Sequence, residues 1–357
     1  MLILAINPGS TSTKLGIFRD EEAVCKLTVS HPAQELARFQ RIADQEEYRY
    51  ETILEFLRSQ GYAPSDFDCV VARGGGLLGL KSGAYRVNPA MLQTLRGIRL
   101  GEHASTLAAG IAYRMMEPLG RPAFIYDAIT VDEWEPMVKI TGLKQYFRRP
   151  YQHTLNARRV AFEVAAELGR SIDDFTIIVA HLGGGITSNL IVNGHMRETM
   201  TSSELGFAAE RCGGFSFNDM VDIFQDYHCD IPVIRKLNGG KGGLVSHFGT
   251  NDLRAVEAMV DQGNEQARLV LEAMAYRIAQ GIAAVSVLVN GAVDAIAITG
   301  GMAHSQRLTG WIRERVEFLA PVFLKPGELE LEALALGGLR VMRGQEEAHE
   351  FIAAPVS

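Results

Sequence analysis

Cysteine is scarce in this sequence, and the few cysteines are far apart. The chain has 357 residues and four cysteines, Cys25, Cys69, Cys212 and Cys229, with no two in a CxxC spacing. Thiolate zinc sites need closely spaced cysteine pairs, and small disulfide-bonded proteins need a higher cysteine content. The sequence therefore argues against both classes and indicates the reduced thiols of a cytoplasmic protein.

An excess of basic residues and a long hydrophobic run are also absent. The formal net charge is −7, and the chain has no block of Lys and Arg residues. Nucleic-acid-binding proteins carry such basic patches, so no nucleic-acid partner is expected. The apolar runs Leu2–Ile6 and Gly281–Val289 are too short for a signal peptide or a membrane span. We therefore expect a cytoplasmic location and no membrane partner.

The length of 357 residues exceeds the usual size of a single hydrophobic core, so two domains are expected. Each half opens with the same pattern: an apolar strand, a Gly-rich turn with Ser or Thr, and two further strands. The first copy begins near residue 2 and the second near residue 175. Strands alternate with helical segments in both halves, which predicts two α/β domains with mixed sheets. Such a duplication indicates two similar domains that face each other across a ligand cleft.

The first Gly-rich turn, within the sequence LILAINPGSTSTKLGIF at residues 2–18, has some features of a phosphate-binding loop. A Walker A loop requires G-x-x-x-x-G-K-[ST] between a strand and a helix. The segment Gly9–Lys14 lacks the second Gly and leads into a strand, so this motif is absent. A tight hairpin turn can instead bind an anion through backbone N–H groups, here with the hydroxyls of Ser10, Thr11 and Ser12. Taken alone, an ordinary polar hairpin turn explains the segment at least as well.

Two further Gly-rich turns follow apolar strands in the second half, at His181–Gly185 and Thr299–Gly301. Glycine carries no Cβ, so the backbone can approach a ligand closely at these positions. We expect the turns of the two halves to bind the phosphates of a nucleotide. Gly300 and Gly301 are then expected to approach the nucleoside.

Motifs spread over nearly the whole chain resemble one known family. In sequence order they are Ile6–Lys14, Ala72–Gly75, Gly101–Ala104, Tyr126–Asp127, Ala180–Gly185, Arg211–Gly213, Thr299–Gly301 and Glu328–Gly338. The chain is similar to the acetokinase family, within the superfamily of acetate and sugar kinases, heat-shock chaperones and actin. The resemblance implies two duplicated actin-like (ribonuclease H-like) α/β domains around a central nucleotide cleft. It implies an N-terminal domain of residues 1–150 with a returning C-terminal helix at about 333–357. Residues 151–332 would form the nucleotide-binding domain and the dimer interface.

Two departures from acetate kinases point to one branch of this family. Pro8 and Gly184 stand where acetate kinases usually carry Ala and Asn, and the chain is shorter than is typical of them. These features resemble the butyrate and branched-chain fatty acid kinases. The implied reaction is reversible phosphoryl transfer from ATP to a short-chain carboxylate, butyrate in the first place, which gives ADP and an acyl phosphate. Mg²⁺ is the implied metal, and a homodimer or higher homo-oligomer is the implied assembly.

Other acids and another class of protein remain open. Isobutyrate, isovalerate, propionate and acetate differ little from butyrate, and one methylene changes discrimination by only about 1–3 kcal/mol. No motif in the sequence identifies the acyl pocket. An ATP-driven clamp like actin or a heat-shock chaperone shares the implied fold, but 357 residues leave no room for an added peptide-binding domain.

Four residues carry the chemistry that the resemblance implies. Arg73 would bind the substrate carboxylate, because a planar guanidinium suits a carboxylate; a structural ion pair is the alternative. Arg211 and His181 would stabilise the transferring phosphoryl group, since this reaction depends on positioning and charge neutralisation. The alternatives for these two are a surface arginine and a buried structural histidine. Asp127, which follows an apolar strand, would orient Mg²⁺ or the substrate.

The remaining implied site residues bind the nucleotide, the substrate or the metal. His103 is a candidate beside the acyl group or an exposed loop histidine, and His153 is interpreted as structural. For the metal, Glu332 is favoured over Glu328 and Glu330 because it leads a Leu/Ala-rich helix, although the alternating Glu residues also fit the exposed face of a strand. The implied phosphate and nucleotide contacts are Asn7, Gly9, Ser10, Ser12, Gly183, Gly184, Gly185, Gly300 and Gly301.

Overall fold

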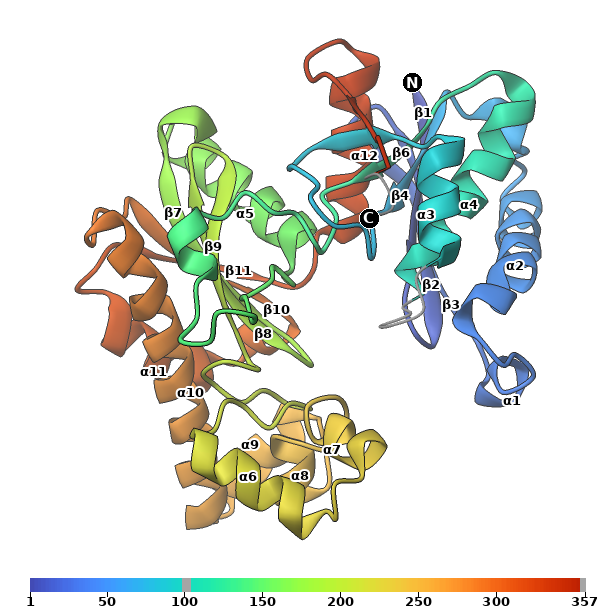
Figure 1. Cartoon of the computed structure of the whole chain (residues 1–357). Coiled ribbons are helices and arrows are strands. Elements are labelled where there is room, and N and C mark those ends of the chain that lie inside the picture. The colour runs from blue at the N-terminus through green and yellow to red at the C-terminus, as the bar shows by residue number, and fades with distance from the viewer. Residues whose placement is uncertain (98–103, 354–357) are drawn as a thin grey trace. The chain divides into compact units, whose positions relative to one another are not determined.

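The computed structural model describes residues 1–97 and 104–353, and the chain divides into two compact units (Figure 1). Unit 1 contains Met1–Asp132 together with Leu329–Ser357, and unit 2 contains Glu133–Glu328. The chain thus returns to unit 1 at its C-terminal end. This division differs from the expected domain bounds, because residues 133–150 belong with unit 2 and residues 329–332 with unit 1.

Unit 1 is built on a seven-stranded sheet. In sheet order the strands are β12 (His349–Glu350), β5 (Ala84–Arg86), β6 (Ala123–Tyr126), β4 (Cys69–Arg73), β1 (Leu2–Pro8), β2 (Ser12–Arg19) and β3 (Glu22–Ser30). β1–β3 form an antiparallel meander, β4 is parallel to β1, and β6 is parallel to β4. β1 is buried over its whole length, as its continuous apolar run predicts for a strand covered on both faces. Helices α4 (Ser105–Met116) and α12 (Glu330–Met342) both pack against it.

Helix α12 approaches the sheet closely at two glycines. A Cβ atom at Gly337 would lie 2.6 Å from the ring of Tyr126, and one at Gly338 would lie 2.3 Å from Val71 Cγ2. The close packing therefore requires glycine at both positions. The other helices of unit 1 are α1 (Ala33–Leu36), α2 (Glu46–Ser59) and α3 (Pro89–Gly97), with 3₁₀ turns at Ile42–Gln45, Pro64–Asp66 and Glu117–Leu119.

Unit 2 repeats the topology of unit 1 in a five-stranded sheet. In sheet order the strands are β11 (Val322–Pro326), β10 (Ala295–Gly300), β7 (Thr176–Leu182), β8 (Ile186–Val192) and β9 (His195–Thr201). β7–β9 form the antiparallel meander, and β10 and β11 continue the sheet as parallel strands. The second hairpin of each unit has one break in register, between Ile17 and Phe18 and between Leu190 and Ile191. The predicted fold class, a duplicated α/β domain, is confirmed.

Helix α10 (Glu265–Ser286) forms the centre of the unit 2 core, where it packs against β7–β9 and α11 (Gln306–Val316). The stretch Glu265–Val289 is long and apolar enough to cross a membrane by length and composition, and 56% of its apolar window is buried inside the protein. Core helices of soluble proteins pass the same test, so this stretch is weak support for a membrane span. The other helices are α5 (Thr154–Glu167), α6 (Phe217–Asp226), α7 (Ile231–Leu237), α8 (Leu244–Phe248) and α9 (Leu253–Asp261), with 3₁₀ turns at Pro136–Lys139, Ile172–Asp174, Val287–Val289 and Gly301–His304.

The predicted start of each half, a strand, a Gly-rich turn and two further strands, occurs as β1–β3 and β7–β9. Residues 32–60 contain α1, a 3₁₀ turn and α2 in succession. The strands β5, β11 and β12 are not predicted from the sequence. β12 has two residues and β5 has three, which is too short for an alternating pattern to be recognised.

Candidate functional site

The turn between β1 and β2 is held from the protein interior by one arginine. The N–H of Gly9 donates to Ser12 O at 2.7 Å and closes the turn. Arg49 on α2 is fully buried, and its guanidinium donates to Ser10 O at 3.2 Å and to Thr13 Oγ1 at 3.1 Å. Ser10 itself is exposed. The predicted phosphate turn is therefore a hydrogen-bonded element with a buried support and an accessible outer surface.

Arg49 forms no ion pair with a carboxylate in the part of the chain that the structure describes. Its Nε and Nη2 atoms donate to Gln45 Oε1 at 3.1 and 3.0 Å. Burial lowers the pKa of Arg49, but a guanidinium remains protonated. His31 Nε2 lies 2.8 Å from Thr13 Oγ1, and burial, with a smaller contribution from the charge of Arg49, lowers the pKa of this histidine to about 4. A buried positive charge thus lies behind the turn, and the sequence does not reveal it because a single Arg in a helix forms no motif.

Asn7, Arg73 and Glu330 meet at one edge of the unit 1 sheet. β1 and β4 are parallel neighbours with Ile6 paired to Ala72, so the residues that follow this pair lie side by side. Asn7 Nδ2 donates to Glu330 Oε2 at 2.5 Å, and Arg73 Nη1 donates to Asn7 Oδ1 at 3.2 Å. Arg73 Nη1 also lies 3.2 Å from Glu330 Oε1, which makes an ion pair. Two predicted site residues are therefore joined by a carboxylate from the first turn of α12; we call this group the Asn7 cluster.

The acidic residues around the start of α12 have different surroundings. Glu330 is 7% exposed, and Lys14 Nζ lies 3.9 Å from its Oε2. Glu332, the favoured metal ligand from the sequence, instead forms an ion pair with Lys26 Nζ at 2.6 Å. Both residues lie in the helix, so the alternating Glu residues do not form a strand. Of these two carboxylates, the one in the Asn7 cluster belongs to Glu330.

Arg73 has a partly unsatisfied guanidinium. Its Nε is buried and has no hydrogen-bond partner among the described residues, and the side chain as a whole is 15% exposed. Buried donors usually have partners, so an unpaired one marks a position where a ligand atom can bind. The ion pair with Glu330 fits the structural alternative for this arginine, whereas the unpaired Nε fits the binding of a carboxylate.

Asp127 has an unusual backbone conformation immediately after β6. Its φ is 43°, in the left-handed region that costs a non-Gly residue about 1 kcal/mol or more. The residue is 3% exposed, and its Oδ1 accepts a hydrogen bond from the N–H of Gly83 at 2.8 Å. β6 is the parallel neighbour of β4, with Tyr126 paired to Arg73, so Asp127 lies at the same sheet edge as the Asn7 cluster. His103 lies outside the described residues.

His181, at the end of β7, is 2% exposed and is contacted on two sides. Its Nδ1 lies 3.0 Å from Asn156 Nδ2, on α5. The ring of His153 stacks on it, with centroids 4.0 Å apart and planes at 16°. His153 Nδ1 in turn lies 3.0 Å from Thr187 Oγ1. His153, interpreted as structural from the sequence, is therefore a direct neighbour of a predicted site residue.

The Gly-rich turn after β7 lies between His181 and Arg211. A Cβ atom at Gly183 would lie 3.3 Å from His181 Nε2, and one at Gly185 would lie 3.6 Å from Arg211 Nε. Arg211 Nη1 donates to Asn238 O at 2.6 Å, which orients the guanidinium. The structure therefore brings together the histidine, the glycine turn and the arginine that the sequence predicts for the second half.

Two of the predicted glycine turns line one pocket of unit 2, which has a volume of about 340 Å³. Gly300 is not among its lining residues. Its φ is 91°, and a Cβ atom there would lie 2.3 Å from Leu182 O, so it allows the close approach of β10 to β7. The pocket is lined by Gly183, Gly184, Ala209, Glu210, Asn251, Asp252, Leu253, Gly301, Met302, Ser305 and Glu328.

Comparison with protein families decides which group of proteins this arrangement belongs to. A model of the acetokinase family matches residues 138–319, slightly more than half of the chain. The chain belongs to the acetokinase family. Its activity is accordingly that of a carboxylate kinase, with a nucleotide and a carboxylate as substrates. The predicted similarity to the acetokinase family and the predicted carboxylate kinase activity are thereby confirmed.

Solved structures of acetokinases share this fold. The acetate kinase of Porphyromonas gingivalis is 18% identical and has a TM-score of 0.78, over 96% of this chain and 99% of that one. A propionate kinase of Francisella tularensis is 16% identical with a TM-score of 0.76, over 94% and 98%. The acetate kinase of Entamoeba histolytica is 17% identical with a TM-score of 0.74, over the same fractions. At such identities the similarity demonstrates the fold and leaves the acid unassigned.

Acetokinases use ATP or ADP with Mg²⁺, and the residues of this acetokinase fit such a metal. Within the described ranges there is no group of three or more His, Cys, Asp or Glu side chains that could hold a metal ion. Mg²⁺ does not need such a cage, because proteins usually hold it through one or two carboxylates, waters and substrate phosphates. The oxygen atoms of Asn7 and Glu330, with the Asp127 carboxylate at the same sheet edge, supply the appropriate donors.

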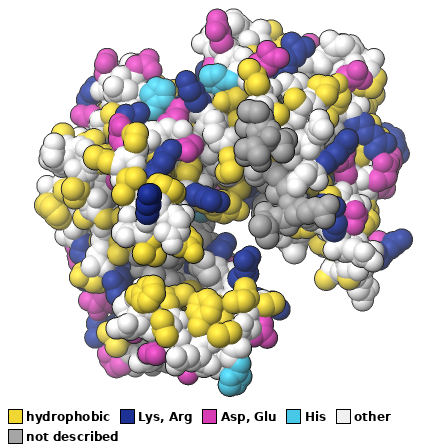
Figure 2. All heavy atoms as spheres, in the orientation of Figure 1, with side chains coloured by type: hydrophobic (Ala, Val, Ile, Leu, Met, Phe, Trp, Pro, Cys, Tyr) yellow, Lys and Arg dark blue, Asp and Glu magenta, His cyan; other side chains and the backbone are white. Residues whose placement is uncertain are grey.

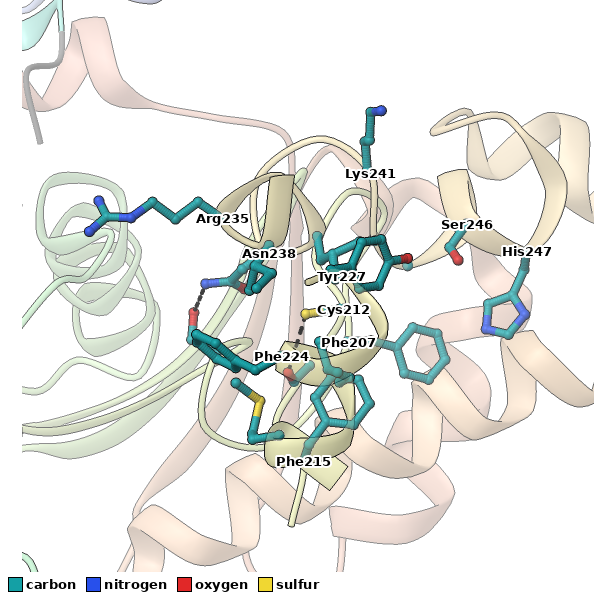
Figure 3. Close-up of a pocket in the computed structure, with 18 residues that line it drawn as sticks. Phe207, Cys212, Phe215, Phe224, Tyr227, Arg235, Asn238, Lys241, Ser246 and His247 are labelled. Atoms are coloured by element: carbon teal, nitrogen blue, oxygen red, sulfur yellow. Dashed lines mark hydrogen bonds between the residues drawn. The ribbon is translucent and has the colours of Figure 1, made fainter. Parts of the chain in front are cut away.

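This acetokinase has a second and larger cavity in unit 2, of about 540 Å³, within its α6–α8 segment. Figure 3 shows aromatic rings gathered around it, with the thiol of Cys212 among them. Burial raises the pKa of that thiol. No residue of α6 or α7 is fully buried, and hydrophobic side chains gather on the surface over α6 (Figure 2). The labelled rings in Figure 3 are Phe207, Phe215, Phe224, Tyr227 and His247.

Proposed function

We propose that this acetokinase transfers a phosphoryl group between ATP and butyrate, reversibly, and that the predicted residues carry the reaction. The observation that carries the proposal is the duplicated sheet. In each unit an arginine from a different element lies beside the end of the first strand of the meander or the turn that follows it. Arg73 contacts Asn7 near the end of β1, and Arg211 lies beside Gly185 in the turn after β7. Such an arrangement suits a reaction that depends on positioning and charge neutralisation more than on a covalent nucleophile.

In unit 1 the Asn7 cluster binds the carboxylate substrate and the metal. The Arg73 guanidinium receives the substrate carboxylate through its unpaired Nε. Glu330 and Asn7 hold Mg²⁺, with Asp127 as a further oxygen donor. The metal, when bound, neutralises charge on the phosphate oxygens. Glu330 replaces Glu332 in this role because its carboxylate contacts Asn7, whereas that of Glu332 is paired with Lys26.

In unit 2 the glycine turns bind the nucleotide. Gly183, Gly184 and Gly301 line the pocket of about 340 Å³, which is large enough for part of a nucleotide. Gly185 lies beside Arg211, and His181 Nε2 faces Gly183. Both side chains can therefore donate hydrogen bonds to phosphoryl oxygens, and the effect is largest where negative charge develops in the transition state.

The choice of butyrate rests on the positions Pro8 and Gly184, where this chain departs from acetate kinases. Acetate and propionate are the principal alternatives, because these acids name the kinases of similar fold. Isobutyrate and isovalerate follow from the branched-chain kinases that share the two departures. We also propose that the enzyme is cytoplasmic and forms a homo-oligomer. Light scattering of the purified protein tests the oligomeric state.

The acid is tested with a panel of carboxylates from acetate to hexanoate, including the branched isomers. Acyl phosphate formed with Mg-ATP is trapped with hydroxylamine, and kcat/KM is compared across the panel. The highest value is expected for butyrate. A higher value for acetate or propionate would reject butyrate but retain the carboxylate kinase, and no acyl phosphate from any acid would favour the ATP-driven clamp.

The metal assignment is tested with Glu330→Gln and its matched control Glu332→Gln, two identical changes in one helix. Glu330→Gln should raise the Mg²⁺ concentration for half-maximal activity by about tenfold or more, because it removes a charged metal ligand and replaces one acceptor oxygen of the Asn7 cluster with an NH₂ group. Glu332→Gln should change this concentration less than about twofold, since it loses an exposed ion pair. The opposite result would identify Glu332 as the metal ligand instead of Glu330. Circular dichroism verifies that both variants fold.

A further inference from the structure

A chain of hydrogen bonds connects a strand end to the ring of His181. Thr299 on β10 is the register partner of His181 on β7, so the two residues are neighbours in the sheet. Helix α5 packs against both strands and places Asn156 above the pair. Asn156 Nδ2 lies 3.3 Å from Thr299 Oγ1 and 3.0 Å from His181 Nδ1. Thr299 Oγ1 lies 3.1 Å from Gly327 O. All three side chains are buried.

The direction of each hydrogen bond in this chain follows from the chemistry of its far end. The carbonyl oxygen of Gly327 can only accept, so the hydroxyl of Thr299 donates to it. Without that hydrogen, two oxygen atoms would face each other at 3.1 Å and repel. The Thr299 hydroxyl has one hydrogen, so Oγ1 accepts from the side chain of Asn156. The group of Asn156 that faces Thr299 is therefore its NH₂ group.

The same NH₂ group faces His181, and it has a second hydrogen for that contact. A ring nitrogen that accepts a hydrogen bond carries no proton. The proton of a neutral His181 then lies on Nε2, the atom nearest the position of a Gly183 Cβ. The ring of His153 stacks on that of His181, with centroids 4.0 Å apart. Two imidazolium rings at this separation would repel, so the stacking disfavours charge on both rings at once.

We infer that Asn156 is a positioning residue that fixes His181 as the neutral Nε2–H tautomer. This inference rests on the proposed function of His181 as a donor to the transferring phosphoryl group. In this tautomer Nε2 presents a hydrogen to a phosphoryl oxygen, whereas the other tautomer would present a lone pair and repel it. His181 thus acts as a neutral hydrogen-bond donor and neither gives up nor gains a proton during the transfer.

The tautomer is measured by long-range ¹H–¹⁵N correlation NMR on the full chain with ¹⁵N-labelled histidine. The signals of His181 are assigned by their loss in His181→Gln. In the native protein we expect Nδ1 to be unprotonated and Nε2 to be protonated at neutral pH. In Asn156→Asp the carboxylate can only accept, so Nδ1 should become protonated. The inference is overturned if native His181 carries its proton on Nδ1, or if Asn156→Asp leaves the ring unchanged.

Kinetics then test whether the tautomer matters for the reaction. Asn156→Asp should lower kcat by about a hundredfold or more, the cost of losing one transition-state donor, with a KM for ATP within about threefold of native. Thr299→Ser keeps the hydroxyl and should retain the native tautomer. Asn193→Asp, the same substitution in the β8–β9 turn, should leave the tautomer and kcat unchanged.

The two measurements separate the inference from the function on which it rests. A changed tautomer in Asn156→Asp with an unchanged kcat would uphold the hydrogen-bond assignment and reject His181 as a transition-state donor. An unchanged tautomer with a reduced kcat would reject Asn156 as the residue that sets it. Circular dichroism verifies that Asn156→Asp and Thr299→Ser are folded.

Discussion

His31 makes the stability of the turn between β1 and β2 depend on pH. Its ring is 4% exposed, and Nε2 lies 2.8 Å from Thr13 Oγ1, at the start of β2. Burial, and to a smaller extent the charge of Arg49, lowers the pKa of His31 from 6.5 to about 4. The folded protein therefore keeps this ring neutral at mildly acidic pH, where the unfolded chain protonates it.

The size of the effect follows from these two values. Between them the unfolded chain binds more protons than the folded one, so stability falls as the pH falls from 6.5 towards 4 and is unaffected above this range. One pKa unit corresponds to about 1.4 kcal/mol. Acidification from about pH 7.5 to about pH 5 should thus lower the free energy of unfolding of unit 1 by about 2 kcal/mol through His31. Full protonation would cost about 3 kcal/mol.

Amide hydrogen exchange followed by mass spectrometry is the suitable assay. Both tryptophans, Trp134 and Trp311, lie in unit 2, so tryptophan fluorescence would report on the other unit. The native protein is compared with His31→Gln at each pH, because the intrinsic exchange rate then cancels. As the pH falls to about 5, peptides of β1–β3 in the native protein should lose about 30-fold more protection than those of the variant, which corresponds to about 2 kcal/mol.

A ratio of exchange rates that stays constant over this pH range would refute the reasoning. It would mean that His31 titrates alike in the folded and unfolded chain, or that it remains neutral in both. Peptides of unit 2 provide the internal control, since their ratio should not change with pH.

Two further predictions concern backbone space and thiol reactivity. Gly300→Ala should lower the free energy of unfolding by about 3 kcal/mol or more, because the φ of Gly300 is 91° and the new Cβ would lie 2.3 Å from a carbonyl oxygen. Gly301→Ala is the control, because nothing lies within 4 Å of its new Cβ. It should change the free energy of unfolding by less than about 1 kcal/mol. Equal shifts of the thermal midpoint in the two variants would contradict this explanation. Cys69 should resist iodoacetamide in the native protein, because it is buried and burial raises the pKa of its thiol to about 12. The exposed Cys229 should react. Equal labelling of the two cysteines in peptide mapping would show that Cys69 is accessible.

The strand and turn pattern of each unit could be predicted because it is local. The apolar run of β1, the glycine turn and the outgoing β2 are contiguous, and so are β7, its turn and β8. Their repetition revealed the duplicated α/β domain without any knowledge of contacts. Short edge strands such as β5 and β12 could not be predicted, because two or three residues carry no periodic signal and their pairing is decided by distant parts of the chain.

Several candidate site residues stand next to a glycine turn, and this position gives them a local signal in the sequence. Asn7 and His181 end apolar strands before such turns, a local signal that points to a site. Arg49 and Asn156 lie in helices of ordinary composition. Only the contacts that their side chains make in the folded protein distinguish them from other helix residues. Glu330 and Glu332 are two residues apart in one helix, and the choice between them could not be made from spacing alone.

The sequence by itself determined the duplicated fold, the three glycine turns and the resemblance to acetokinases, since each is written in short contiguous segments. The tertiary structure decided which side chains share an environment. It placed Glu330 against Asn7 and Glu332 against Lys26, and it placed a buried arginine behind the turn between β1 and β2. Helix residues two positions apart point in different directions, and a hydrogen bond depends on a few tenths of an ångström. Only the packing of strands and helices against one another fixes such directions and distances.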